Sequence, residues 1–271
     1  MKLRNLFEMI GFKSKPKHYP YILKEYDIQS IGLIKYPQWT HPKESLKEVK
    51  LDVIKGYMSY IDKGDFCIDI GAHTGDTTLP MALAAGQTGC VVALEPNPYV
   101  FTILEKTSRT NPHLTNIKPI MAAVGAEEGF MTFEYSDSGF CNGGRHDNIS
   151  SLKHGHHYKQ EVFVIDLVKE LKSDFYSVLP NLKFIKVDTE GYDLFVLQSM
   201  KEIISQYRPV IKTEVFKQTD DQYRIRLLKF FEELKYSVFL IDEEPLGKGV
   251  PLSNSNINIK KHYDILALPN H

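Results

Sequence analysis

Residues 66–76 constrain the fold of this 271-residue chain more than any other segment. An apolar run with one carboxylate, Phe66–Ile70, is followed by two glycines four positions apart, Gly71 and Gly75, and then by a helical pattern from Asp76. Such a run is typical of a buried parallel strand, and a glycine-rich turn after it lets backbone N–H groups approach a ligand closely. The segment therefore predicts a strand, a turn and a helix, with a ligand site at the turn.

A second apolar run follows at the distance expected for a ribose contact. Cys90–Leu94 ends at Glu95-Pro96-Asn97, and Glu95 lies twenty residues after Gly75. An acidic residue at the tip of the neighbouring strand can accept hydrogen bonds from both hydroxyls of a ribose. Together the two segments predict a nucleoside-containing cofactor that lies across the carboxyl ends of two adjacent parallel strands.

The turn differs from the dinucleotide-binding fingerprint. Gly-x-Gly-x-x-Gly seats a pyrophosphate on the N-terminus of a helix, whereas this turn has the spacing Gly71-x-x-x-Gly75, with His73 inside it and Asp69 before it. The carboxylate of Asp69 would repel a pyrophosphate but suits a cationic amino group. S-adenosylmethionine has a ribose, an ammonium group and a sulfonium but no phosphate, so the turn favours it over a nicotinamide dinucleotide.

Composition narrows the function classes further. Lys and Arg total 33 against 34 Asp and Glu, so the net charge offers no case for nucleic-acid binding. Cys67 and Cys90 fall in predicted core strands, where a reduced cysteine acts as a small hydrophobe, which favours a reducing, cytoplasmic location. No apolar run approaches the length that spans a bilayer.

Residues 1–64 are predicted to form a partly helical N-terminal extension, with a polar, proline-interrupted stretch at 36–42 and a helical pattern over 44–61. Apolar residues near its start share one helical face and precede several lysines: Leu3, Leu6, Phe7, Ile10, Lys13, Lys15 and Lys17. Such a helix can make peripheral contact with an anionic membrane through residues 1–17, or pack on its own domain or on a second subunit of a homo-oligomer. Both alternatives are kept.

Residues 65–271 alternate strand and helix patterns and are predicted to form the cofactor-binding domain. Strands are expected at 66–70, 91–94, 117–124, 184–187, 209–215, 236–241 and 263–268, and helices at 77–85, 99–110, 193–205 and 219–234. The alternation predicts an α/β, Rossmann-like fold, in which a mostly parallel sheet has helices on both faces. The last two strands have no helix between them, which predicts an antiparallel pair with the C-terminal strand at the sheet edge.

An insertion interrupts this alternation at about 126–165. Two extra strands, at 131–135 and 161–165, flank residues 136–158, which are rich in Gly, Ser, Asn and His. Long loops in compact domains are usually functional or disordered. A mobile substrate lid is favoured over a metal site, because the histidines of the loop fit no closed zinc arrangement. These histidines are His146, His154, His156 and His157.

A second group of polar residues follows the strand at 184–187. Lys186, Asp188 and Glu190 lie at its carboxyl end, which is the edge where ligands bind in open α/β sheets. The structural alternative is that Asp188 caps the following helix while Lys186 is paired for burial. Glu214 is another carboxylate near the carboxyl end of a predicted strand, the one at 209–215. With Glu95, these residues predict a cleft that holds buried charge, which functional sites tolerate.

These motifs resemble those of the FkbM-type methyltransferases. The order matches over about residues 50–269: Asp69-Ile-Gly-Ala-His-Thr-Gly75, Glu95-Pro-Asn97, Ala122-Ala-Val-Gly125, Ile185-Lys-Val-Asp-Thr-Glu-Gly191, Glu214 and Tyr263-Asp-Ile-Leu-Ala-Leu-Pro269. The Lys-x-Asp-x-Glu-Gly segment is the most specific part. The resemblance implies a class I S-adenosylmethionine-dependent fold and O-methylation of sugar or polyketide hydroxyls. His73 departs from it, because the family commonly has Asn there, and the N-terminal extension lies outside it.

The predicted site combines both groups of residues. The predicted cofactor-binding residues are Asp69, Gly71, Ala72, His73, Gly75, Thr77, Thr78, Glu95, Pro96, Asn97, Ala123 and Asp188. The two glycines would let the backbone approach the methionine portion, with Asp69 near its ammonium group and Glu95 on the ribose. The predicted catalytic residues are Asp188, Glu190, Lys186 and His73. A Mg²⁺ or Mn²⁺ ion held by Asp188, Glu190 or Glu214 is the alternative to a base alone.

The predicted function is S-adenosylmethionine-dependent O-methylation of a sugar, a glycan or another small hydroxylated metabolite. Methyl transfer is an in-line displacement, so the acceptor must be aligned, and an alcohol must lose its proton as it attacks. The Asp188/Glu190 pair is the preferred base, with Lys186 orienting it. Two rivals remain: a nicotinamide-dependent oxidoreductase and a catalytically inactive cofactor-binding protein. A nucleic-acid methyltransferase is disfavoured, because Asp-Thr-Glu-Gly stands where amino-directed enzymes have a Pro-Pro-aromatic arrangement.

Overall fold

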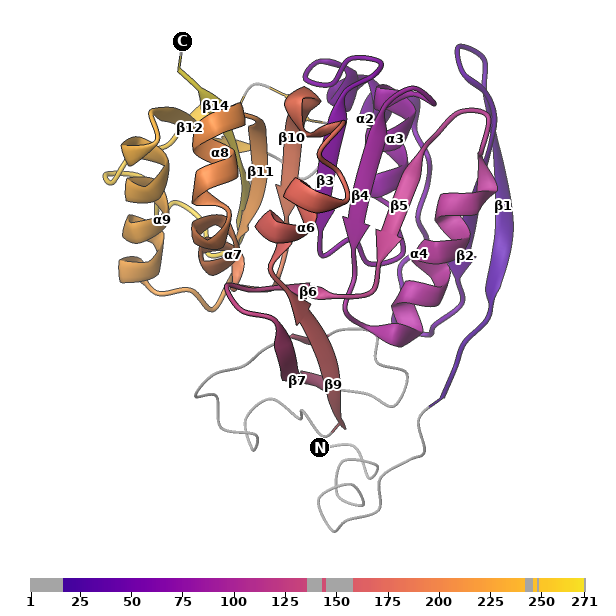
Figure 1. Ribbon diagram of the computed structural model, residues 1–271, viewed down its shortest axis with the longest axis horizontal. Coiled ribbons are helices and arrows are strands. Elements are labelled where there is room, and N and C mark those ends of the chain that lie inside the picture. The colour runs from indigo at the N-terminus through magenta and orange to yellow at the C-terminus, as the bar shows by residue number, and fades with distance from the viewer. Residues whose placement is uncertain (1–16, 136–142, 145–157, 242–245, 248, 271) are drawn as a thin grey trace.

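The computed structural model describes residues 17–135, 143–144, 158–241, 246–247 and 249–270. Its centre is an eight-stranded sheet with the strand order β13-β12-β14-β11-β10-β3-β4-β5 (Figure 1). The strands of this sheet are β3 (Phe66–Ile70), β4 (Cys90–Leu94), β5 (Ile117–Ile120), β10 (Leu182–Val187), β11 (Val210–Val215), β12 (Tyr236–Ile241), β13 (Val250–Pro251) and β14 (Tyr263–Pro269). Neighbouring strands from β11 to β5 run parallel, which confirms the predicted fold class.

Helices cover both faces of the sheet, because alternate residues of each strand point to opposite sides. They are α2 (Leu51–Met58), α3 (Thr78–Ala85), α4 (Pro98–Thr110), α6 (Leu167–Ser173), α7 (Asp193–Ser199), α8 (Lys201–Tyr207) and α9 (Asp221–Glu233). Ile68 of β3 packs in an apolar cluster with residues of α6 to α9. Its neighbour Cys67 packs in a second cluster with residues of α2, α3 and α4. The sheet is therefore buried on both faces, and its carboxyl edge remains available for a ligand.

The C-terminal strand lies inside the sheet. β14 pairs antiparallel with β12, as predicted, but it also pairs antiparallel with β11 and so lies between them. Its position at the sheet edge was therefore predicted wrongly. The physical reason is that Tyr263, Ile265, Leu266 and Ala267 are all buried. A strand with neighbours on both sides buries such residues better than an edge strand does. The short strand β13 forms this edge of the sheet instead.

Three predicted elements have other bounds in the structure. The helix expected at 193–205 is interrupted at Met200 between α7 and α8. The helical pattern at 44–61 yields only α2. The strand expected at 117–124 divides because β6 (Ala123–Val124) leaves the central sheet and pairs with β9. Helix α6 and a short 3₁₀ turn at Leu179–Asn181 were not predicted.

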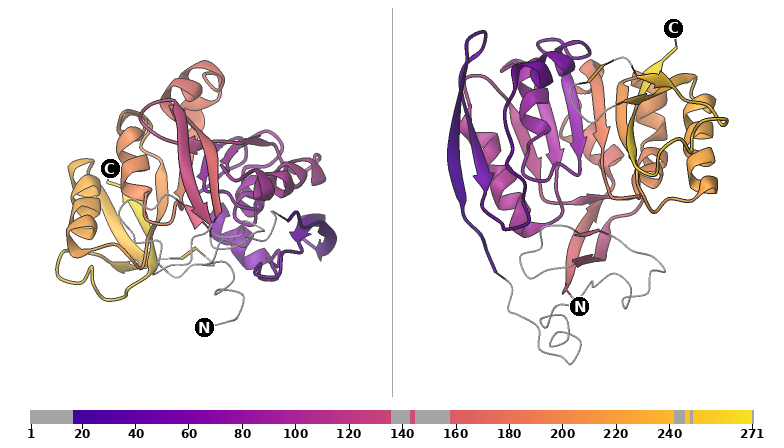
Figure 2. Two further views of the ribbon diagram at one scale, coloured as in Figure 1. Left: turned by 90° about the horizontal axis from the view of Figure 1, so that it is seen from below. Right: turned by 180° about the vertical axis from the view of Figure 1, so that it is seen from behind.

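The N-terminal residues form a hairpin that the sequence pattern did not predict. β1 (Tyr21–Ile28) and β2 (Gly32–Trp39) pair antiparallel, and Figure 2 shows the hairpin beside α4. Trp39 packs against two residues of α4, Val100 and Ile103. Prolines and polar residues around β2 concealed the strand in the sequence, while the buried Trp39 side chain holds it in place.

A second, four-stranded sheet has the order β6-β9-β7-β8. β7 (Gly129–Tyr135) and β9 (Tyr158–Ile165) confirm the two strands expected in the insertion, and β8 (Gly143–Gly144) pairs with β7. The four loop histidines, most of the predicted lid and residues 1–16 lie outside the described residues. The lid and the peripheral membrane contact therefore stay predictions.

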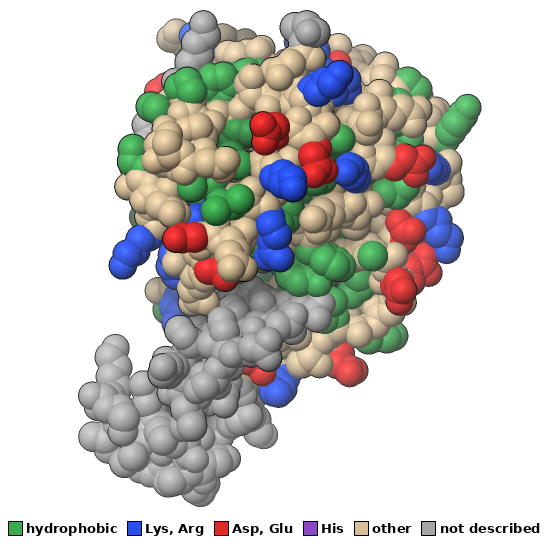
Figure 3. Space-filling model, turned by 90° about the vertical axis from the view of Figure 1, so that its left-hand side faces the viewer, with side chains coloured by type: hydrophobic (Ala, Val, Ile, Leu, Met, Phe, Trp, Pro, Cys, Tyr) green, Lys and Arg blue, Asp and Glu red, His purple; other side chains and the backbone are tan. Residues whose placement is uncertain are grey.

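The surface carries charges of both signs. Acidic and basic side chains are interspersed on the face that carries α9 (Figure 3). Within the described ranges, every helix is too short or too polar to cross a membrane. Cys67 and Cys90 are buried free thiols, as predicted for small core residues.

Candidate active site

A cavity of about 370 Å³ lies at the carboxyl ends of the parallel strands, which is a volume typical of small-molecule sites. Its walls come from the turns after β3, β4 and β10, from β6 and β7, and from the segment between β2 and α2. Ten predicted site residues line it: Gly71, His73, Thr77, Glu95, Pro96, Asn97, Ala123, Lys186, Asp188 and Glu190. The lining does not include Asp69, Ala72, Gly75, Thr78 or Glu214.

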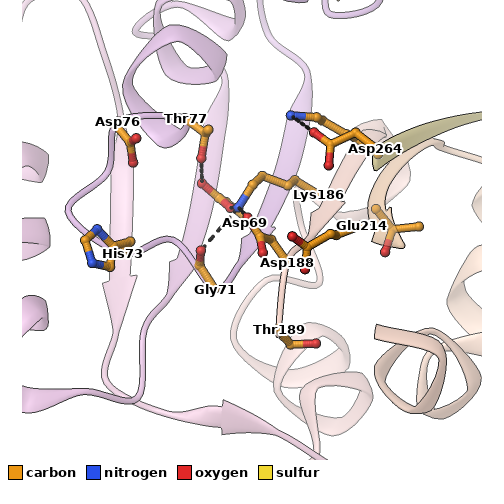
Figure 4. A network of polar contacts seen from close by, with 12 residues as sticks. Asp69, Gly71, His73, Asp76, Thr77, Lys186, Asp188, Thr189, Glu214 and Asp264 are labelled. Carbon is orange, nitrogen blue, oxygen red and sulfur yellow. Dashed lines mark hydrogen bonds and ion pairs between the residues drawn. The ribbon is translucent and has the colours of Figure 1, made fainter. Parts of the chain in front are cut away.

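Asp69 lies beneath the cavity and binds protein groups with both of its oxygens. Lys186 donates from Nζ to Asp69 Oδ1 at 3.2 Å, and the hydroxyl of Thr77 donates to Oδ2 at 3.1 Å (Figure 4). The hydroxyl of Thr78 donates to the same oxygen at 2.6 Å. The Asp69 side chain is fully buried. It thus ties β3 to the start of α3, and its predicted contact with the cofactor ammonium stays a prediction.

Lys186 connects the ends of β3 and β10. Its Nζ also donates to the carbonyl oxygen of Gly71 at 3.2 Å and lies 3.4 Å from Asp188 Oδ2. Burial opposes the charged form of Lys186, but Asp69 and Asp188 outweigh it and hold the pKa of the ammonium group well above its usual range. The pairing for burial anticipated in the sequence is therefore present, and it also orients the Asp188 carboxylate at the cavity.

The two glycines of the turn serve contacts within the protein. Gly71 has φ +77°, and a Cβ added there would lie 1.9 Å from the carbonyl oxygen of Asp188. Gly75 has φ +85°, and a Cβ there would lie 2.9 Å from Thr107 Cγ2 on α4. Only glycine combines positive φ with such close approach. Gly75 thus allows α4 to pack closely on the turn, and its predicted role in bringing the backbone to the ligand stays a prediction.

Glu95 presents a fixed carboxylate to the cavity. The backbone N–H groups of His73 and Asn97 donate to its Oε2 and Oε1, each at 2.9 Å. Burial raises the pKa of Glu95, while His73 and the two hydrogen bonds oppose this shift. Each carboxylate oxygen has a second lone pair, so Glu95 can still accept the hydroxyls of a ribose. Asn97 itself caps α4 by accepting from Tyr99 N at 3.0 Å.

His73 adopts a backbone conformation that is uncommon outside glycine, with φ +49°. This conformation aims its N–H at Glu95. Its Nε2 lies 3.9 Å from Glu44 Oε2, and its ring contacts the edge of Trp39 at 6.1 Å between centroids. Strained backbone clusters at functional sites. The imidazole therefore joins the turn to the N-terminal segment at the cavity wall.

The turn after β10 places Asp188 and Glu190 at the cavity, while a third carboxylate holds the turn. Glu190 has φ +55°, and burial together with the charge of Asp188 raises its pKa. Asp193 accepts from Thr189 N at 3.4 Å and from Gly191 N at 3.1 Å. Asp193 thus holds the turn before α7, and α7 has no side-chain cap hydrogen bond, so the capping role considered for Asp188 is absent.

Glu214 lies behind this turn, outside the cavity lining. Its Oε1 is 3.4 Å from His262 Nε2. Burial and the charges of Asp188 and Asp193 raise the pKa of Glu214 to about 9. In the part of the chain that the structure describes, no group of three or more His, Cys, Asp or Glu side chains is arranged to hold a metal ion. The metal stays a prediction, and no reaction step below depends on one.

Sequence reasoning missed the wall contributed by the N-terminal segment. Glu44, Ser45 and Lys47 line the cavity, and Lys47 Nζ lies 2.7 Å from Asp76 Oδ2. Tyr135 of β7 adds an aromatic wall. Asp76 could have been noticed as an acidic residue directly after Gly75, but nothing in residues 40–50 indicates that this segment reaches the turn.

Comparison with known proteins places the chain among methyltransferases. A family model described as the methyltransferase FkbM domain matches residues 69–238. No curated protein matches the chain significantly. Among solved structures, an FkbM methyltransferase from Methylobacillus flagellatus KT is 14% identical with a TM-score of 0.49, over 77% of this chain and 44% of that one. The chain therefore spans less than half the length of that protein.

Two further solved structures are similar at the same level. An S-adenosylmethionine-dependent O-methyltransferase from Thermotoga maritima is 13% identical with a TM-score of 0.44, over 92% of this chain and 78% of that one. Fibrillarin from Aeropyrum pernix, solved with natively bound S-adenosyl-L-methionine, is 10% identical with a TM-score of 0.44, over 94% and 98%.

Proposed function

The chain belongs to the FkbM methyltransferase family, and we propose that it transfers the methyl group of S-adenosylmethionine to a hydroxyl oxygen of a sugar, a glycan or another small hydroxylated metabolite. One observation carries the proposal: Asp188 and Glu190 lie in the same cavity as Glu95. A carboxylate suited to a ribose and carboxylates suited to a proton thus face one small-molecule space.

The residues present fit S-adenosylmethionine. Glu95 is fixed by two backbone N–H groups and keeps lone pairs for the ribose hydroxyls. Ala122 and Ala123 leave room for a flat base beside the end of β5. When bound, the cofactor would supply a methyl group on a positively charged sulfur. The Asp188 and Glu190 carboxylates favour a cationic cofactor at this edge over an anionic one.

Proton removal is the chemical task of the β10 turn. An alcohol becomes a better nucleophile as its proton passes to a base whose pKa is near the working pH. Burial and the charge of Asp188 raise the pKa of Glu190 above that of an ordinary carboxyl group, which suits Glu190 to accept the proton. Asp188, held by Lys186 at 3.4 Å, orients the acceptor for an in-line approach, which contributes much of the acceleration.

The direct test is transfer of a labelled methyl group from S-adenosylmethionine to a panel of sugars, glycans and hydroxylated metabolites. Glu190→Gln is expected to lower kcat by about 10²–10⁴-fold, the usual contribution of a general base, while the affinity for S-adenosylhomocysteine stays within about twofold. Asp188→Asn is expected to lower kcat as well.

The matched control is Glu202→Gln, because Glu202 is an exposed carboxylate that pairs with Lys172 and does not line the cavity. It should methylate the same acceptor at the wild-type rate. Wild-type turnover in both Glu190→Gln and Asp188→Asn would remove the catalytic assignment. A Glu95→Ala variant with unchanged cofactor affinity would remove the ribose assignment.

The rival functions make different predictions with the same protein. A cofactor-binding protein without catalysis would bind S-adenosylmethionine and methylate nothing in the panel. An oxidoreductase would bind added NADH and change its fluorescence. A methyltransferase is not expected to bind NADH, so the fluorescence should stay unchanged. The family membership favours methyl transfer over both.

The cellular setting is part of the proposal. Cys67 and Cys90 are buried free thiols, which supports a reducing compartment such as the cytoplasm. Mass-spectrometric comparison of glycans and small metabolites from cells with and without this protein would identify the acceptor and the methylated position.

A further inference from the structure

The amino-acid end of S-adenosylmethionine requires partners for an ammonium group and a carboxylate. Asp69, the residue predicted for the ammonium, lies outside the cavity lining and binds Lys186, Thr77 and Thr78. Lys186, the buried cation next to it, is bound to Asp69 and lies beside Asp188. Both residues already have partners within the protein, whereas another part of the cavity wall carries the two charges.

An ion pair on the N-terminal wall offers both charges. Lys47 Nζ lies 2.7 Å from Asp76 Oδ2, and both residues line the cavity. Their side chains keep 31% and 25% of their exposure, so a ligand can reach them. Burial opposes ionisation of Asp76, but the charges of Lys47 and His73 outweigh it and lower its pKa. The wall thus presents a carboxylate and an ammonium group side by side.

We propose, on the premise of the function proposed above, that Lys47 and Asp76 bind the amino-acid end of S-adenosylmethionine, with Lys47 on its carboxylate and Asp76 on its ammonium group. An α-amino acid has opposite charges on adjacent groups, and this ion pair presents the complementary arrangement. Each charge therefore gains a partner on binding, and no charge is left buried and uncompensated.

The β1–β2 hairpin holds Lys47 in place for this contact. The backbone N–H of Lys47 donates to Gln38 Oε1 at 2.7 Å, and the Tyr26 hydroxyl donates to the Lys47 carbonyl oxygen at 2.8 Å. Gln38 is buried and also donates from Nε2 to the carbonyl oxygen of Ser45 at 3.1 Å. A binding residue on a fixed backbone loses less entropy when a ligand arrives.

The same hairpin is tied to the cofactor turn itself. The hydroxyls of Tyr36 and Thr74 form a buried hydrogen bond of 2.7 Å. Residues before position 69, outside the match to the family model, thus complete the wall next to Asp76. The N-terminal hairpin is therefore a part of the cofactor site, where it recognises the amino-acid end.

The test measures binding by calorimetry with three probes. S-adenosylhomocysteine has both charged groups of the amino-acid end, decarboxylated S-adenosylmethionine keeps its ammonium group but lacks the carboxylate, and methylthioadenosine lacks both. Lys47→Met is expected to weaken S-adenosylhomocysteine by about 10- to 100-fold, the value of one charge-assisted hydrogen bond. It should leave the other two probes within about twofold. Asp76→Asn should weaken both amino-bearing probes and leave methylthioadenosine unchanged.

Two further variants serve as controls. Lys50→Met removes a lysine from the same segment whose side chain is 58% exposed and paired with Glu48, and it should bind all three probes as the wild type does. Lys47→Arg keeps the charge and should retain most of the affinity for S-adenosylhomocysteine. Methylthioadenosine binding reports on the folding of every variant.

The outcomes separate this inference from the function on which it rests. Unchanged S-adenosylhomocysteine affinity in Lys47→Met would overturn the inference, as would an equal loss of S-adenosylhomocysteine and methylthioadenosine. A wild-type protein that binds these two probes equally well would also overturn it, while leaving the proposed function intact. A wild-type protein that binds none of the probes would refute the proposed function itself.

Discussion

Replacing Lys186 with methionine tests the buried ion pair that connects β3 and β10. Methionine keeps most of the apolar stem of the side chain but removes the ammonium group beside Asp69. Lys186 is only 4% exposed and Asp69 is fully buried, so the Asp69 carboxylate would lose its charged partner in a buried position. Breaking a buried pair in this way costs about 3–5 kcal/mol, because one charge stays buried without compensation.

This free energy converts into a measurable change in melting temperature. Unfolding entropy is about 2.1 cal/mol/K per residue, which for 271 residues amounts to about 0.57 kcal/mol/K. A loss of about 3–5 kcal/mol then lowers Tm by about 5–9 °C. Thermal melting followed by circular dichroism, together with urea denaturation, measures both quantities.

The double variant Asp69→Asn/Lys186→Met distinguishes the charge from the packing. It removes both charges, while the amide side chain introduced at position 69 keeps an oxygen for the two threonine hydroxyls, so the double variant should be more stable than Lys186→Met alone. Lys172→Met, at an exposed ion pair with Glu202, should cost less than about 1 kcal/mol. A Tm loss in Lys186→Met no larger than in Lys172→Met would refute the reasoning.

Two further predictions concern the carboxyl edge of the sheet. Burial and the charges of Asp188 and Asp193 raise the pKa of Glu214 from about 4.5 to about 9. Because the folded state holds this proton more tightly than the unfolded state, the free energy of unfolding should fall as pH rises across this window. Urea titrations at several pH values should show a smaller fall for Glu214→Gln, and a fall equal to that of the wild type would contradict the assignment. Gly71→Ala should lower both Tm and kcat, because its Cβ would lie 1.9 Å from the Asp188 carbonyl oxygen. The control Gly129→Ala, whose Cβ would have nothing within 4 Å, should change the free energy of unfolding by less than about 0.5 kcal/mol. Equal melting temperatures of the two variants would contradict the close approach.

The sequence by itself determined the central strands and the edge at which the site lies. The apolar runs of β3, β4 and β10 are short and nearly continuous, as strands buried on both faces must be. Because parallel strands end at one edge, Glu95, Asp188 and Glu190 had to converge once those strands were recognised. The local signal was sufficient here, since strand period and turn chemistry are properties of adjacent residues.

Only the tertiary structure decided which way each charge points and what closes the cavity. The sequence pattern pointed to Asp69 for the ammonium group, yet Asp69 binds Lys186 below the cavity, whereas Asp76 lines the cavity beside Lys47. The tertiary structure likewise decided that β14 pairs with both β11 and β12 and so lies between them. These outcomes depend on packing between segments far apart in the chain, and no periodicity within a segment carries that information.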